Sequence, residues 1–504
     1  MTLRSGIIRG AFSLGGARVA SNLFNAAALL ILARLLTPED FGIVAIAMAI
    51  LTIVQSSTEL SVQNALIQKD RVEIAHIDTT WTISLIRAAI IVAFFVIAAW
   101  PLSLVYDRPD MIPVFVVSGV TGALIGLQNP HIWLATKSMR FLPLALVQFA
   151  YKGIGVVLAI AMALAIPSYW AIIAGNAVGA LGAAALSYLL IPYRPRLTLV
   201  HWREIWAFSG WMFFNQLFET LNWRIDQLII GLVVPKGALG IYAMADNLAV
   251  IPTRETIQPI RHALFPGLAN LSGDLKRLTR SHLLAQSSIA MLIAPLGIGL
   301  ALVAEPAVAL ALGDQWNSAV PFVEICAIYY ALGTFSMGLQ PVAMALGKTR
   351  LLFIRQLVAV CIKLPLIIGG LWLGGLMGAA IGRLASEMIT VLIEFLFLRH
   401  LLHLPLSQQL ARHSLTLFAL AVMAGAVTAL HALGAIDGMA VWQSLMIEVA
   451  AGAFAYATAL AAGWWATGKP DGPVSELAKA LQKQIAKRRG AAIHAAAVAP
   501  AKIG

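Results

Sequence analysis

The chain has 504 residues, of which 60% are hydrophobic and only 12% are charged, and its mean hydropathy is +0.85. Soluble globular domains carry about a quarter of their residues as charged side chains, so this composition excludes an ordinary water-soluble protein. The formal net charge is +12, but the basic residues are scattered over many short segments, which argues against a nucleic-acid-binding surface.

Long apolar stretches follow one another along almost the whole chain. A transmembrane helix needs roughly 20 mostly apolar residues, and about fourteen such stretches can be placed, separated by short polar breaks. We predict the spans at residues 10–33, 41–66, 80–104, 111–135, 143–166, 169–192, 206–233, 239–268, 283–304, 319–346, 351–373, 375–398, 414–434 and 442–466.

The distribution of Lys and Arg over the loops predicts the orientation of these spans. With the N-terminus in the cytoplasm, nearly all basic loop residues lie on the cytoplasmic side, and only Arg34, Arg108 and Lys236 lie outside. This is the asymmetry that the positive-inside rule describes, so both termini are expected in the cytoplasm. The basic tail at 469–504 is expected to be either an amphipathic helix on anionic lipid or a disordered anchor.

An internal repeat divides the predicted spans into two halves. The sequence Gly42-Ile43-Val44-Ala45-Ile46-Ala47 recurs as Gly240-Ile241-Tyr242-Ala243-Met244-Ala245, and Gly126-Leu127-Gln128 recurs as Gly338-Leu339-Gln340 in the same order. Six spans per copy preserve orientation, so a pseudo-two-fold axis along the membrane normal is expected, with the substrate between the lobes.

The predicted fold is therefore an all-α polytopic membrane protein with about 14 transmembrane helices, arranged as two pseudo-symmetric six-helix lobes plus two extra helices. The expected divisions are an N-lobe at 1–200, a C-lobe at 201–400, the two extra spans at 401–468 and the cytoplasmic tail at 469–504.

Several basic residues fall inside the predicted spans. A charged side chain at mid-membrane costs roughly 2.5 to 3.5 kcal/mol or more if it faces lipid, so these side chains are expected to face a cavity. The candidate substrate-binding cations are Arg18, Lys152, Arg224, Arg254, Arg261 and Lys363. Arg254 and Arg261 share one helical face, and an arginine can bind a phosphate through two hydrogen bonds, so the cargo is expected to be anionic.

Other intramembrane charges have simpler interpretations. Arg383 and Glu387 are four residues apart and are expected to form an internal ion pair, whereas Arg87, Arg355 and also Lys363 could extend to the membrane interface. Asp226 and Asp246 are the candidates for coupling to protons or sodium.

No pattern in the chain indicates catalysis, a metal or a cofactor. The ten histidines show no metal-ligand spacing, and both cysteines, Cys326 and Cys361, fall inside spans. Gly347-Lys348-Thr349 ends like a phosphate-binding loop, but Val342 stands where the first glycine belongs. Because the loops reach at most about fifteen residues, room for a catalytic domain is lacking, so we expect no enzyme, no metal and no cofactor.

The segment Ala33-Arg34-Leu35-Leu36-Thr37-Pro38-Glu39-Asp40-Phe41-Gly42 and the segment Asn64-Ala65-Leu66-Ile67-Gln68 resemble polysaccharide flippases of the multidrug/oligosaccharidyl-lipid/polysaccharide exporter superfamily. The segment Arg224-Ile225-Asp226-Gln227-Leu228-Ile229-Ile230-Gly231 and the run 239–268 are similar to the same family.

The resemblance implies a flippase of the bacterial inner membrane, working by alternating access. Its implied cargo is an undecaprenyl-pyrophosphate-linked oligosaccharide repeat unit for exopolysaccharide, capsule or O-antigen. The expected partners are this lipid-linked oligosaccharide, membrane lipids and a polysaccharide polymerase or co-polymerase. The alternatives are a flippase for a peptidoglycan lipid precursor, a cation-coupled drug exporter of the same fold, and a membrane scaffold that transports nothing.

Overall fold

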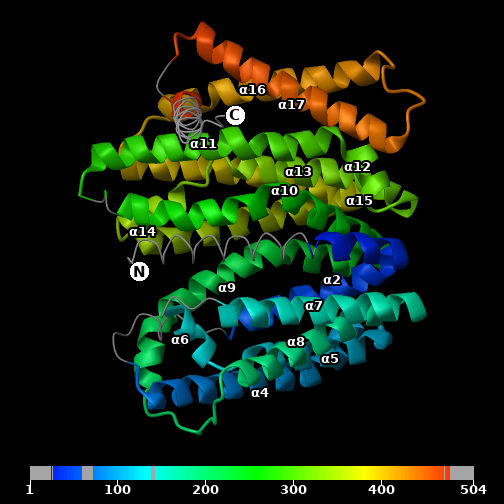
Figure 1. Cartoon of the computed structure of the whole chain (residues 1–504), viewed down its shortest axis with the longest axis vertical. Coiled ribbons are helices and arrows are strands. Elements are labelled where there is room, and N and C mark those ends of the chain that lie inside the picture. Colours follow the sequence, from blue (N-terminus) through cyan, green and yellow to red (C-terminus); the bar gives the residue numbers. More distant parts are fainter. Residues whose placement is uncertain are drawn as a thin grey trace, which may run out of the picture. The chain divides into compact units, whose positions relative to one another are not determined.

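The computed structural model describes residues 24, 26–58, 72–137, 142–269, 271, 273–469 and 472–476, and these contain helices, turns and short connections without any strand (Figure 1). In chain order the helices are α2 (Pro38–Ser56), α4 (Ile74–Val105), η1 (Pro109–Met111), α5 (Ile112–Gly126), α6 (His131–Lys137), α7 (Leu142–Ala165), α8 (Trp170–Leu190), α9 (Trp202–Val233), α10 (Lys236–Ala269), α11 (Leu275–Leu302), α12 (Ala304–Ala311), η2 (Asp314–Ala319), α13 (Val320–Gly333), α14 (Leu339–Ala345), α15 (Thr349–Leu402), α16 (Leu406–Ala432) and α17 (Val441–Ala466). Most of the tail and residues 10–23 and 25 of the first predicted span lie outside the described residues, whereas Ala26–Leu35 form a short apolar helix.

Length and composition make many of these helices membrane spans. Among the described residues, nine helices are long and apolar enough to cross a bilayer. Helix α15 contains two of the predicted spans, because its helical backbone is interrupted at Gly374 and at Gly375, whose φ is 58° and ψ is −141°. The break falls where 351–373 was predicted to end and 375–398 to begin. The all-α polytopic membrane fold is thus confirmed.

Two predicted spans are each divided into a longer and a shorter helix. The span at 111–135 becomes α5 and α6, and the span at 319–346 becomes α13 and α14. At the first break, the Asn129 side chain donates to the carbonyl oxygens of Ser187 and Ile191 and accepts from the backbone N–H of His131. The side chain thus satisfies the first N–H of α6 and two carbonyl groups at the end of α8.

Helix α2 begins with a capping box that the sequence encodes directly. The Thr37 hydroxyl accepts a hydrogen bond from the Asp40 N–H at 3.3 Å, and Asp40 Oδ2 accepts from the Thr37 N–H at 2.9 Å. Pro38 occupies the first turn, where its missing N–H is no loss. Asp40 also accepts from the Tyr169 N–H at 2.8 Å, which ties the start of α2 to the connection before α8.

The two copies of the internal repeat meet through their glycines. A Cβ atom placed on Gly42 would clash with the Lys236 carbonyl, and one placed on Gly240 would clash with the Pro38 carbonyl. Pro38 and Lys236 are separated along the chain by the same offset as Gly42 and Gly240. The contact is therefore reciprocal, which is the pattern that a two-fold axis between the copies produces.

The chain divides into two compact units. The first comprises the described parts of Met1–Ile251 with Ala307–Cys326 and Thr349–Ile389, and the second comprises those of Pro252–Pro306, Ala327–Lys348 and Thr390–Gly504. The expected lobe boundary near residue 200 falls inside the first unit, so the division into lobes of six spans stays a prediction.

Within the first unit, α4 packs on α5, α5 on α8, α8 on α7, and α2 on α9 (Figure 1). Glycines allow α7 and α8 to approach closely, since a Cβ on Gly155 would lie 2.9 Å from the Gly175 carbonyl oxygen. Small residues at such crossings are typical of membrane helices, whose association depends on close packing.

Within the second unit, α16 packs on both α11 and α17. The Tyr456 hydroxyl of α17 donates to the Met291 carbonyl of α11 at 2.6 Å.

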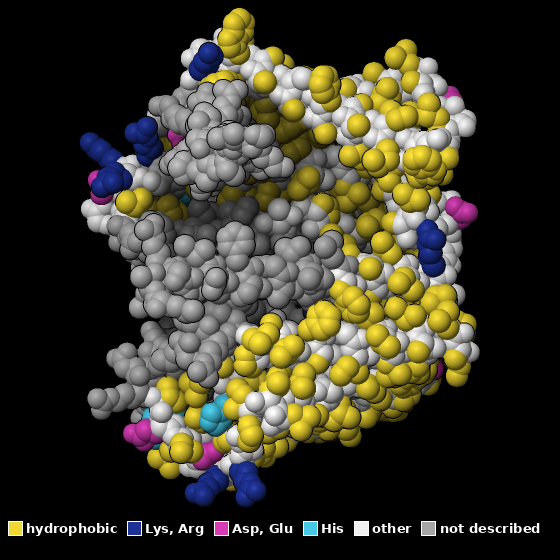
Figure 2. Space-filling model, in the orientation of Figure 1, with side chains coloured by type: hydrophobic (Ala, Val, Ile, Leu, Met, Phe, Trp, Pro, Cys, Tyr) yellow, Lys and Arg dark blue, Asp and Glu magenta, His cyan; other side chains and the backbone are white. Residues whose placement is uncertain are grey.

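The described part of the face in Figure 2 is covered mainly by hydrophobic side chains, with the charged ones toward the edges of the view. This is the surface expected of helices that face lipid.

Candidate functional site

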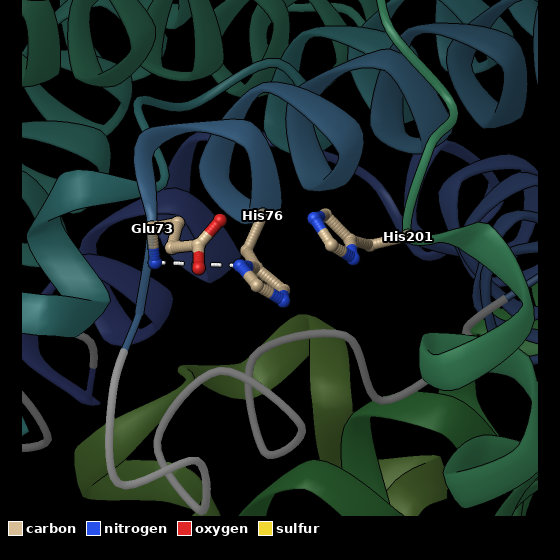
Figure 3. A group of neighbouring side chains, drawn as sticks. All are labelled: Glu73, His76 and His201. Atoms are coloured by element: carbon tan, nitrogen blue, oxygen red, sulfur yellow. Dashed lines mark hydrogen bonds between the residues drawn. The ribbon is translucent and has the colours of Figure 1, made fainter.

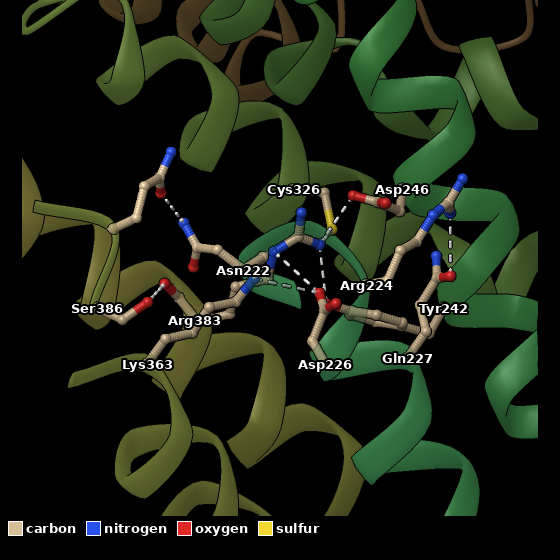
Figure 4. A network of polar contacts seen from close by, with 11 residues as sticks. Asn222, Arg224, Asp226, Gln227, Tyr242, Asp246, Cys326, Lys363, Arg383 and Ser386 are labelled. Atoms are coloured by element: carbon tan, nitrogen blue, oxygen red, sulfur yellow. Dashed lines mark hydrogen bonds and ion pairs between the residues drawn. The ribbon is translucent and has the colours of Figure 1, made fainter. Parts of the chain in front are cut away.

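Three helices of the first unit bring acidic and basic side chains together in its interior. Helix α9 supplies Asp226, helix α10 supplies Asp246, and α15 supplies both Lys363 and Arg383 from the two sides of its glycine break. All four residues are at most 5% exposed. Because α15 folds back at its glycine break, so that Gly370 packs on Gly378, both Lys363 and Arg383 reach Asp226 (Figure 4).

Arg383 lies at the centre of this network. Its guanidinium donates to Asp246 Oδ1 at 2.8 Å and to the Tyr242 hydroxyl at 2.8 Å, and its Nε lies 3.3 Å from Asp226 Oδ2. Tyr242 in turn donates to Asp226 Oδ2 at 3.1 Å. Each carboxylate is therefore held by the same arginine from a different helix.

Lys363 supplies the second positive charge. Its ammonium donates to the Asn222 carbonyl oxygen at 2.5 Å and lies 3.8 Å from Asp226 Oδ2. With two carboxylates and two cations, the network is neutral when every member is ionised. Such compensation is what allows charges to be buried, because an unpaired ion in a low-dielectric interior is strongly unfavourable.

Arg224 lies close to this network on α9. One of its guanidinium nitrogens donates to the Gln227 side chain at 3.1 Å. Among the described residues, no group accepts a hydrogen bond from its buried Nε. Arg224 is thus a cation with donor capacity beyond its local partner, as a binding residue for an anion requires.

The other sequence-predicted site residues are placed less fully. Lys152 is half-buried on α7. Arg254 and Arg261 lie on α10, of which the backbone is described at these positions. Arg18 lies outside the described residues. The structure therefore brings Lys363, Asp226 and Asp246 together and leaves the rest of the cationic cavity a prediction.

Sequence reasoning did not find the role of Arg383 or Tyr242. The i, i+4 spacing predicted a pair of Arg383 with Glu387, which stays a prediction, but it did not predict the contacts of Arg383 with Asp226 on α9 and Asp246 on α10. Tyr242 occupies the position of Val44 in the repeat, and this departure between the copies is the one signal that could have drawn attention to it.

Comparison with known proteins decides the family. Residues 31–321 match the family described as "Polysaccharide biosynthesis protein". The chain belongs to this family. The matched region includes the α2 capping box, the repeat contact, Asp226 and Asp246.

Similar proteins agree with this membership. The chain is 23% identical over 376 residues to the lipopolysaccharide biosynthesis protein WzxC of Escherichia coli, covering 72% of this chain and 75% of WzxC. It is 24% identical over 328 residues to the succinoglycan biosynthesis transport protein ExoT of Rhizobium meliloti, covering 64% of this chain and 66% of ExoT.

Among solved structures, the lipid II flippase MurJ in an inward closed conformation has the same fold. The two align with a TM-score of 0.72 at 15% sequence identity, covering 90% of this chain and 99% of MurJ. At this level of identity the similarity establishes the fold alone.

Proposed function

We propose that the protein is a flippase that moves undecaprenyl-pyrophosphate-linked oligosaccharide repeat units across the bacterial inner membrane. The observation that carries the proposal is membership of the polysaccharide biosynthesis family by a chain whose described part is a helical membrane protein. Transport through alternating access fits a protein with a reciprocal contact between two repeated helices. The protein acts as a transporter and not as an enzyme.

The basic residues inside the spans divide into two groups under this proposal. Arg18, Lys152, Arg224, Arg254 and Arg261 bind the pyrophosphate, because guanidinium and ammonium groups compensate its charge as the head group crosses. Lys363 belongs with Arg383, Asp226 and Asp246, where protonation of a carboxylate or its pairing with sodium would release a cation toward the cargo. This exchange is the proposed coupling step.

The surrounding system follows from the same proposal. Both termini lie in the cytoplasm, so that the basic loops face the side on which the repeat unit is synthesised. The exported unit enters exopolysaccharide, capsule or O-antigen, and a polymerase or co-polymerase receives it on the outer side.

Reconstitution in liposomes tests the proposal. A fluorescent undecaprenyl-pyrophosphate oligosaccharide is placed in one leaflet, and its appearance in the other is measured for wild type and for Arg254→Ala combined with Arg261→Ala. The matched control is Arg277→Ala combined with Arg280→Ala, which removes two exposed arginines near the start of α11. We expect transport by wild type and control and its loss in the first variant. Absence of transport by wild type under every ion gradient and potential would overturn the proposal.

The structural similarity to MurJ makes a peptidoglycan lipid precursor the second candidate cargo. Both cargoes share a lipid pyrophosphate, so the cationic residues do not separate them. Parallel assays with a lipid-linked muropeptide decide between them, and we expect transport of the oligosaccharide only.

A further inference from the structure

The connection between α8 and α9 is hydrogen-bonded to the first turns of α4. The Tyr193 hydroxyl donates to Asp78 Oδ1 at 2.5 Å, and the Thr198 N–H donates to the Thr82 hydroxyl at 3.1 Å. Burial and the neighbouring Asp78 carboxylate raise the pKa of Tyr193, so its hydroxyl keeps the proton that it donates. Asp78 itself is 4% exposed. The segment that ends at His201 is therefore held in a defined position.

These hydrogen bonds hold His201 over His76, although the two residues are far apart along the chain. The two imidazole rings are stacked, with centroids 3.7 Å apart and planes 11° from parallel. Glu73 precedes α4 and lies beside His76, and one potential ligand atom from each of the three residues lies within 4.8 Å of the others (Figure 3). Two imidazoles and a carboxylate thus converge at one end of α4.

We propose that Glu73, His76 and His201 form a binding site for a divalent transition-metal ion of the Zn²⁺ class. Imidazole nitrogen and carboxylate oxygen are the ligands that Zn²⁺ takes in proteins, and two histidines with one carboxylate make a known open set with a fourth position for water. A hard cation such as Mg²⁺ or Ca²⁺ would instead require oxygen ligands, of which this cluster offers one side chain.

At least one of the two imidazole rings must turn before the three side chains can bind one metal ion. Bond lengths of 2.0 to 2.1 Å in a tetrahedral site put ligand atoms about 3.3 Å apart, compared with a present spread of up to 4.8 Å. His76 is buried and fixes one ligand, whereas Glu73 is exposed and His201 is half-buried, so these two can turn toward the ion. The lone pairs of two nearly parallel rings lie in separate planes, so His201 must turn out of the stack for its nitrogen to face an ion bound by His76.

Binding also changes one local hydrogen bond. The Glu73 N–H donates to His76 Nδ1 across a long 3.3 Å. A metal on Nδ1 would replace that bond, and a metal on Nε2 would move the ring proton to Nδ1. In either case the bond from the Glu73 N–H to His76 Nδ1 is lost, and the neutral ring keeps its one proton on the nitrogen that does not bind the metal.

The location gives the site a mechanical consequence. His201 lies between the sixth and seventh predicted spans, whereas Glu73 and His76 lie between the second and third. A bound ion would therefore cross-link this connection to the start of α4. No residue of the buried ion network and no candidate cargo-binding arginine belongs to the cluster.

Metal titration of the full-length protein, purified in detergent with any affinity tag removed, tests the proposal. Zn²⁺ binding is measured by competition with a chromogenic chelator, and Co²⁺ is used for its absorption bands in tetrahedral N/O coordination. The variants are His201→Ala and Glu73→Gln, chosen because both side chains are at least partly exposed, and the control is His400→Ala, an exposed histidine near the end of α15.

We expect one Zn²⁺ per wild-type and control chain, with affinity at least roughly 100-fold weaker in His201→Ala, since loss of even an outer-shell partner costs 10- to 100-fold. Glu73→Gln should also weaken binding while the variant stays monodisperse. The proposal is overturned if wild type binds no Zn²⁺, or if the two ligand variants bind it as tightly as His400→Ala does, which would show that the stacked rings serve packing alone.

Discussion

At the scale of single residues, Arg383 pairs with two buried carboxylates. It contacts both Asp226 and Asp246, and the Tyr242 hydroxyl accepts a hydrogen bond from it and donates one to Asp226. Removing a partner from a buried ion pair is far more destabilising than never having the pair, because the remaining charge is left without compensation. Arg383 should therefore affect stability strongly.

Replacing Arg383 with Met should lower the free energy of unfolding by about 3 to 5 kcal/mol, the cost of leaving a buried charge unpaired. The measurement is denaturant or thermal unfolding in detergent, with Arg399→Met as the control because Arg399 is exposed near the end of the same helix. Lys363→Met combined with Asp226→Asn removes one charge of each sign and keeps the Arg383–Asp246 pair, so the double variant should be more stable than Lys363→Met alone. Equal stability of wild type and Arg383→Met would contradict the ion network.

At the scale of helices, the reciprocal glycine contact explains why the two copies of the repeat begin alike. Gly42 and Gly240 leave room for the backbone of the opposite helix, and the contacted carbonyls belong to Pro38 and Lys236. A side chain at either glycine has no rotamer that avoids this contact, since Cβ itself would meet backbone atoms. The start of α2 must then move away from the start of α10.

Gly42→Ala and Gly240→Ala should each destabilise the protein by about 1 to 3 kcal/mol, the usual range for overpacking. Gly237→Ala is the matched control, because Gly237 lies near the start of α10, as Gly240 does, and a Cβ there meets nothing within 4 Å. Alanine favours a helix over glycine, so the control should be neutral or slightly stabilising. Thermal unfolding of the three variants measures this; identical behaviour at all three positions would refute the close crossing.

The helices themselves were the most predictable part of the molecule. Transfer into lipid depends on each residue's own hydropathy, so the spans at 143–166 and 169–192 correspond closely to α7 and α8. The breaks after Gly126 and Gly333 were not predicted, because side-chain capping by residues such as Asn129 depends on distant partners like Ser187. Local hydropathy does not contain that information.

At the scale of the whole molecule, the same distinction separates family from site. The segment around Thr37 and Asp40 carried the family resemblance, and the structure shows why it is informative, since it encodes a capping box and a close helix crossing. The ion network and the Glu73, His76, His201 cluster could not be predicted, because they join residues that are far apart along the chain. Spacing rules detect ligands that are close in sequence, and His201 lies in the connection before α9, far along the chain from Glu73 and His76.

The orientation of the chain is the remaining property that belongs to the whole molecule. The distribution of basic residues predicts that the connection before α16 lies in the cytoplasm and the connection after it outside. Single cysteines at the two ends of α16 report this directly: Ser407→Cys before most of the helix and Ala435→Cys after it, both at exposed positions. The background replaces Cys326 and Cys361 with Ala.

In intact spheroplasts, a membrane-impermeant maleimide should label Ala435→Cys, whereas Ser407→Cys should be labelled only after the membrane is permeabilised. The two positions lie near opposite ends of one 27-residue helix. At 1.5 Å per residue this helix is about 40 Å long, which exceeds the roughly 30 Å hydrocarbon core. The reverse labelling would invert the orientation and place the basic loops outside. Equal labelling of both would mean that α16 does not span the membrane, and a flippase with cytoplasmic termini would then need a different set of spans.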